Sequence, residues 1–107
     1  VPYGGAEIFF KDQRYEFSFM VSEAGVDSIW VYPDPKYKFY YSGNRGSGKP
    51  RDIESMREEV DPFKLSTQNI LFLRAETGGV LGLRLQFANQ PEPGDYFKMA
   101  FTAAIFQ

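Results

Sequence analysis

The sequence contains no cysteine and no histidine. Without cysteine the chain has no disulfide, no thiol nucleophile and no thiolate ligand for a metal. Without histidine it has no imidazole base, no Ser-His-Asp triad and no conventional zinc site. We therefore expect a protein that is not an enzyme, with no catalytic residue, no bound metal and no cofactor.

The chain also lacks an excess of charge of either sign. Its 107 residues carry 12 Lys and Arg against 14 Asp and Glu, which gives a formal net charge of −2. General binding to nucleic acid or to an anionic membrane surface needs a basic patch, so the balance disfavours both. No run approaches the roughly 18 apolar residues of a membrane span, and none is expected.

Alternation of apolar and polar residues is the main positive signal. A period of two places one set of side chains on each face of a β-strand. Runs of this kind, separated by Gly, Pro and polar clusters, cover 6–10, 15–21, 27–32, 36–41, 70–74, 80–87 and 96–106. The expected core consists of Tyr15, Phe17, Phe19, Val21, Ile29, Val31, Phe39, Leu81, Leu83, Leu85, Phe87, Phe97, Met99, Phe101 and Ile105.

One segment departs from this alternation. Residues 51–60 are rich in helix formers, and Ile53, Met56 and Val60 recur at a helical spacing. Together, the runs predict an all-β fold: a single domain, residues 1–107, forming an antiparallel β-sandwich of about seven strands. We expect it to be immunoglobulin-like or jelly-roll-like, with one short inserted α-helix near 51–60.

A glycine-rich stretch suggests phosphate chemistry. Residues 43–49 read Gly-Asn-Arg-Gly-Ser-Gly-Lys and resemble the G-x-x-x-x-G-K motif of the P-loop family. The family has Ser or Thr at the next position to hold Mg²⁺, and this chain has Pro50. A P-loop also sits in a parallel sheet, whereas these runs are joined by hairpin-length turns. We expect a surface loop that does not bind ATP with Mg²⁺.

A weaker signal for anionic ligands remains in the same region. Five of the basic residues fall within sixteen positions, interleaved with tyrosines: Lys36, Lys38, Arg45, Lys49 and Arg51. Cations beside aromatic rings suit single-stranded nucleic acid, a sulfated glycan or a phosphorylated partner. Lysines on a solvated edge strand that block aggregation explain the same pattern.

Aromatic residues provide the other candidate surface. If Ile29 and Val31 face the core, Trp30 and Tyr32 face outwards, and Tyr40 lies opposite its own aromatic neighbours. These three residues could form an exposed platform for a sugar ring or a protein partner. A second buried layer beneath a covering segment explains them equally well.

The functional expectation follows from composition. The chain has 11 Phe, 7 Tyr and 1 Trp, more aromatic side chains than a small core readily hides, and protein interfaces are enriched in such residues. We expect a structural or assembly module that self-associates or binds a protein partner, as in an extracellular, envelope, secretion or virion assembly. A carbohydrate-binding module is the alternative, and an anion binder is the third. Val1 at the first position indicates a processed N-terminus or a cloning boundary, and an extracytoplasmic or virion location is slightly favoured.

Overall fold

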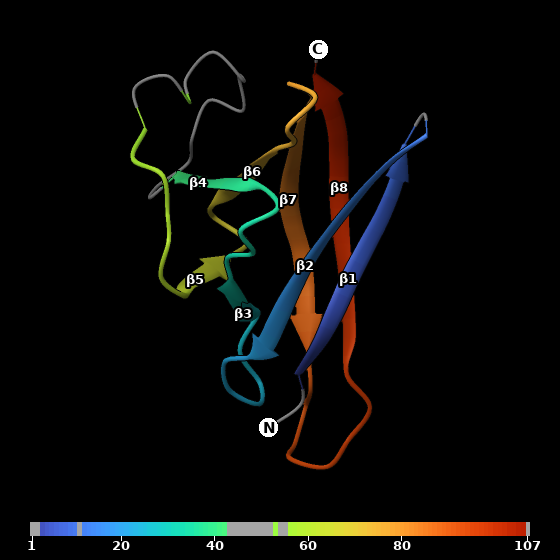
Figure 1. Ribbon diagram of the computed structural model, residues 1–107. Coiled ribbons are helices and arrows are strands. Elements are labelled where there is room, and N and C mark those ends of the chain that lie inside the picture. Colours follow the sequence, from blue (N-terminus) through green and yellow to red (C-terminus); the bar gives the residue numbers. More distant parts are fainter. Residues whose placement is uncertain (1–2, 11, 43–52, 54–55, 107) are drawn as a thin grey trace.

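The computed structural model describes residues 3–10, 12–42, 53 and 56–106, and its strands form two antiparallel sheets (Figure 1). The eight strands are β1 (Tyr3–Phe10), β2 (Gln13–Val21), β3 (Ser28–Tyr32), β4 (Lys38–Ser42), β5 (Phe63–Ser66), β6 (Ile70–Arg74), β7 (Val80–Asn89) and β8 (Lys98–Phe106). One sheet, sheet A, has the order β1-β2-β3-β5, and the other, sheet B, has the order β4-β6-β7-β8. The predicted all-β antiparallel sandwich is confirmed.

The main core lies between the two sheets. Each strand contributes every second residue, because alternate side chains point to one face. Sheet A supplies Tyr15, Phe17, Phe19, Ile29, Val31, Phe63 and Leu65, and sheet B supplies Phe39, Leu71, Leu73, Leu81, Leu83, Leu85 and Ala88. The aromatic rings of Phe17 and Phe101 meet edge to face across the sandwich, with their centroids 5.7 Å apart. Such pairs add to the stabilisation from apolar burial.

Strand β5 is missing from the sequence prediction. It has only four residues, directly after Pro62, and it pairs with β3 so that Ile29 lies opposite Leu65. Its inward residues, Phe63 and Leu65, are buried while Lys64 is exposed. Alternation over four residues is too short to separate from chance, although it was present.

Phe87 is a core prediction that is wrong. It is 41% exposed, whereas Ala88 beside it is 1% exposed. The register between β7 and β8 shifts between Leu85 and Phe87, which marks a β-bulge. A bulge inserts one residue and reverses the faces that follow it, so strict alternation mispredicts every residue beyond. Ile105 is another predicted core residue, and its side chain is not among those that the structure describes.

The helix expected over 51–60 is not shown, and Val60 does not belong to a buried face. Ile53 is buried and Met56 is half-buried, but Val60 is 71% exposed. Beyond Met56 the chain is extended: Glu58 bridges to Tyr40, and the Glu59 amide donates a 2.8 Å hydrogen bond to the Phe39 carbonyl. The free backbone edge of β4 offers partners that a helix would forgo.

The described part of this segment covers the outer face of sheet B. Ile53 and Met56 pack on a second apolar cluster made of Tyr40, Ile70, Phe72 and Val80. The burial of Tyr40 in this cluster agrees with the alternative of a second buried layer beneath a covering segment.

Candidate functional site

Trp30 and Tyr32 lie on the outer face of sheet A. Ile29 and Val31 alternate with them and are fully buried in the core, whereas both aromatic residues are half-buried. Trp30 is paired with Met20 on β2 and with Lys64 on β5. The Tyr32 hydroxyl donates to the Met20 sulfur at 3.5 Å. Both side chains therefore lie on the outer face of sheet A, and we call the pair the Trp30–Tyr32 ledge.

Tyr40 does not share this ledge. It belongs to β4 in sheet B, is paired with Phe72, and is 8% exposed beneath the segment that contains Ile53. The predicted three-residue platform is therefore not formed, because Tyr40 faces the outer side of the other sheet and is covered there. Two of the three residues, Trp30 and Tyr32, lie on the same face of one sheet.

The basic residue Lys36 is neutralised within the protein. Its Nζ lies 3.1 Å from Glu16, and Glu16 also accepts from Arg14 at 2.6 Å. Arg14 in turn contacts Glu7 at 3.3 Å. The hydrogen bond from Lys36, more than the nearby Arg14 charge, lowers the pKa of Glu16, and the same contact raises the pKa of Lys36. These four side chains are linked by ion pairs and carry no net charge, so they attract an anion weakly.

Of the other basic candidates, Lys38 alone belongs to the described residues. Lys38 is exposed at the start of β4, opposite Arg74 on β6. Arg45, Lys49 and Arg51 lie outside the described residues. The loop with the P-loop-like pattern, residues 43–50, lies outside them as well.

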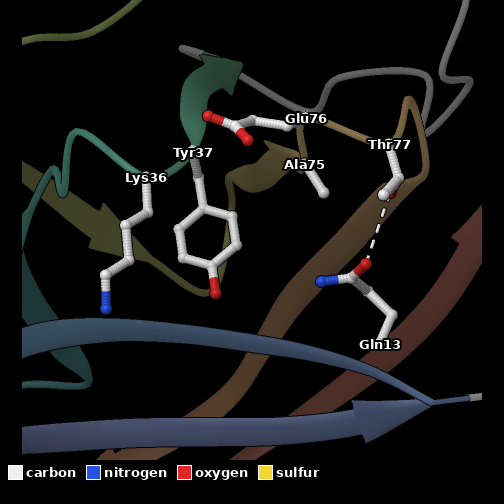
Figure 2. Close-up of a pocket in the computed structure, with 6 residues that line it drawn as sticks. All are labelled: Gln13, Lys36, Tyr37, Ala75, Glu76 and Thr77. Carbon is white, nitrogen blue, oxygen red and sulfur yellow. Dashed lines mark hydrogen bonds between the residues drawn. The ribbon is translucent and has the colours of Figure 1, made fainter.

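A small pocket of about 280 Å³ opens at one end of the sandwich (Figure 2). It lies where the start of β2, the β3–β4 connection and the β6–β7 turn meet, and it is lined by Gln13, Lys36, Tyr37, Ala75, Glu76 and Thr77. Most of its polar groups are already bonded. Thr77 donates to Gln13 at 3.3 Å, as drawn in Figure 2, and the Tyr37 hydroxyl donates to the Arg14 carbonyl at 2.9 Å. In the described part of the chain, no group of His, Cys, Asp or Glu is placed to hold a metal ion.

Strands β1 and β8 form the edges of the two sheets on the same side of the sandwich (Figure 1). Strand β8 has nine residues, and Lys98 at its start is its one charged residue. Strand β1 has eight residues, and its Glu7 is ion-paired with Arg14. An edge strand presents backbone N–H and C=O groups in alternate positions with no partner in its own sheet.

The sandwich is incompletely closed between these two edges. The inward residues there, Ala6 and Ile8 of β1 and Met99 and Phe101 of β8, pack on the core but stay partly exposed. We call these four residues the open seam. On the opposite side, the rings of Tyr41 and Phe63 lie 5.0 Å apart and close the sandwich between β4 and β5. The seam therefore places solvent-accessible apolar surface beside two unpaired strand edges.

Comparison with protein-family models, with curated proteins and with solved structures finds no match. The structure also has no helix, among its described residues, that is long and apolar enough to cross a membrane.

The edge of β8 was not identified from the sequence. The signal was present, because residues 99–106 contain no charged residue and no proline. Natural edge strands are commonly protected by one of these. Which strand lies at an edge depends on topology, and local alternation carries no information about strand order.

Proposed function

We propose that this chain is a non-enzymatic interaction or assembly module that binds a protein partner by taking an added β-strand at the edge of β8. In this mode, the partner's backbone supplies hydrogen bonds to the edge, and alternate side chains supply specificity. The observation that carries the proposal is the long β8 edge, with one terminal charge, running beside the open seam.

The other three edges are each less suited to this role. The edge of β4 is partly occupied by Glu58 and Glu59. Strand β5 has only four residues and carries Lys64. Strand β1 carries the Glu7 ion pair on its outer face. Charges and shortness are the devices that keep edges from pairing, and β8 has neither along most of its length.

Exposed aromatic residues support an interaction role. Tyr96, two residues before the start of β8, is 91% exposed, and Phe9 on β1 is 69% exposed. Phe87 on β7 is 41% exposed after the bulge. Aromatic residues are enriched at the centres of protein interfaces, where charges are depleted. A subunit of an extracellular, envelope, secretion or virion assembly is the class of protein that these features suit.

A photo-crosslinking amino acid at position 102 tests the proposal. Thr102 is exposed in the middle of β8, and Gln68, exposed in the β5–β6 turn, provides the control position. Each variant is expressed in the cells that make the protein and irradiated, and adducts are identified by mass spectrometry. We expect one defined adduct from position 102 that forms again with purified components. No adduct, or the same adducts from both positions, would overturn the proposal.

Carbohydrate binding is the second candidate, and the Trp30–Tyr32 ledge favours it. Trp30 is the only tryptophan in the chain, so its fluorescence reports directly on this surface. Titration with soluble oligosaccharides should change the emission if a sugar ring stacks on the ledge. The change should be lost in Tyr32→Ala and kept in Tyr96→Ala. An emission that no oligosaccharide alters removes this candidate.

A further inference from the structure

We infer that the strand added to β8 is β8 of a second copy of this chain, paired antiparallel about a two-fold axis at Thr102. The inference rests on the proposed function, because it names the partner for the same edge. It follows from the length, charge and side-chain sizes of β8.

The two-fold at Thr102 gives the longest overlap. Strand β8 runs from Lys98 to Phe106, so Thr102 is its central residue, and all nine positions then find a partner. In this register Lys98 lies opposite position 106, and Ala100 lies opposite position 104. Each residue meets one on the same face of the sheet, as a continuous antiparallel sheet requires. Symmetric dimers of this kind use one surface patch on both copies.

The charges of β8 allow this pairing. Lys98 is its one charged residue, and antiparallel pairing puts the two copies of Lys98 at opposite ends of the new ladder. Like charges directly opposite one another would be destabilising, and the arrangement has none. A formal net charge of −2 per chain adds little long-range repulsion.

The inward side chains of β8 are complementary in size. Phe101 is partly exposed at the open seam, and Ala103 is exposed two residues further along the same face. In the two-fold register, Phe101 of each copy lies opposite Ala103 of the other. A large side chain next to a small one fills the seam without overpacking, and it removes apolar surface from water. On the outer face, Ala100 and Thr102 are small enough for the strands to approach.

Single cysteines test the register, because the chain has no cysteine of its own. In Thr102→Cys the two Cα atoms should lie about 4.5 to 5.5 Å apart, within the range of a disulfide. In Ala100→Cys, on the same face of the same strand, they should lie about 14 Å apart, since each opposes position 104. Under mild oxidation we expect a covalent dimer from Thr102→Cys and none above background from Ala100→Cys or Gln68→Cys.

Sedimentation equilibrium tests the association without a covalent bond. We expect a monomer–dimer equilibrium between micromolar and millimolar concentration. Ala103→Lys should raise the dissociation constant by at least about tenfold, because it places a charge beside the second copy's Phe101. Gln68→Lys adds the same charge elsewhere and should leave the constant unchanged. The dimer should persist near 1 M salt, where the screening length falls to about 3 Å, because apolar burial is not screened.

The possible results separate this inference from the proposed function. A monomer at millimolar concentration, or equal cross-linking of Thr102→Cys and Ala100→Cys, overturns self-pairing. If the photo-crosslinker at position 102 then still captures one different protein, the proposed function stands with another partner. If position 102 captures nothing, both fail together. Circular dichroism of each variant checks that its sheets are formed.

Discussion

The hydroxyl oxygen of Tyr15 lies directly over the backbone of Gly79, so that a Cβ atom placed on this glycine would stand 2.9 Å from it. Tyr15 belongs to β2 of sheet A, and Gly79 closes the β6–β7 turn of sheet B, where its carbonyl accepts from Ala75 at 3.0 Å. Tyr15 is 2% exposed, and its burial raises the pKa of its hydroxyl. This close approach packs the β6–β7 turn of sheet B against strand β2 of sheet A.

Gly79→Ala should therefore destabilise the protein by about 1 to 3 kcal/mol, the usual effect of an extra group in a packed site. Tyr15→Phe removes the atom that the new methyl meets, so the double variant should regain most of this loss. Urea unfolding of the four proteins in the cycle measures the coupling.

The matched control is Gly78→Ala. A Cβ at Gly78 would meet nothing within 4 Å, but the residue has a φ of 91°. Its substitution should cost about 1 kcal/mol through backbone strain alone. Tyr15→Phe should not reduce that cost. Equal rescue of both alanine variants would show that contact with the hydroxyl is not the cause.

The bulge in β7 makes opposite predictions for two adjacent residues. Phe87→Ser should lower the free energy of unfolding by at most about 1 kcal/mol, because Phe87 is already 41% exposed. Ala88→Leu should destabilise by about 1 to 3 kcal/mol, because Ala88 is buried and its amide donates to Asp27 at 3.2 Å. Thermal unfolding compares the two variants. A larger loss of stability from Phe87→Ser than from Ala88→Leu would indicate that β7 has no bulge at this point.

Truncation of Phe17 and truncation of Phe101, whose rings contact each other, should reduce stability by unequal amounts. Phe17→Ala should destabilise by about 3 to 5 kcal/mol, because the ring is 2% exposed and leaves a cavity. Phe101→Ala should cost less, because water already reaches the open seam. The double variant should be less destabilised than the sum of the two, since the rings contact each other. Two equal effects would indicate that the seam is closed in the folded protein.

Low pH should reduce the stability of the protein because it protonates Glu16. The Lys36 hydrogen bond lowers the pKa of this carboxyl below 4.5 in the folded state. Its contribution to stability is therefore present above pH 4.5 and is lost as the pH falls through the folded-state pKa. Glu16→Gln should lower stability at neutral pH and flatten this acid loss. Denaturant unfolding at several pH values, with exposed Glu23→Gln as the control, measures the difference, and identical pH profiles for both variants would contradict it.

The sequence predicted the strands well where alternation ran for five residues or more. Strands β2 and β3 fall where the pattern put them, because one face of each is buried and the other is less so. Strand β6 also falls where it was expected, although both of its faces are buried. Residues 56–60 failed for a reason outside their own sequence: their helical propensity competed with the free edge of β4, which Glu59 reaches. Propensity is a weak prior that tertiary contacts override.

The candidate site was less predictable than the fold. Alternation placed Trp30 and Tyr32 on the same outward face, which is correct, but it could not tell that Tyr40 belongs to the other sheet. Nor could it show that Lys36 is paired with Glu16, twenty residues earlier in the chain. Both facts depend on which strands become neighbours, and that is decided by the packing of the whole sandwich.

The strand order has a consequence for the way the chain folds. The β1–β2 and β7–β8 hairpins join neighbours in sequence, but β3 pairs with β5, and β4 pairs with β6. Each of these last two pairings must close a loop that contains a strand of the opposite sheet, so neither sheet can be completed independently of the other. Loop-closure entropy must be overcome before such contacts stabilise the chain, and domains of this kind fold in about milliseconds to seconds. The inner faces of β7 and β8 are apolar, so we expect the chain to be prone to aggregation until sheet A covers them.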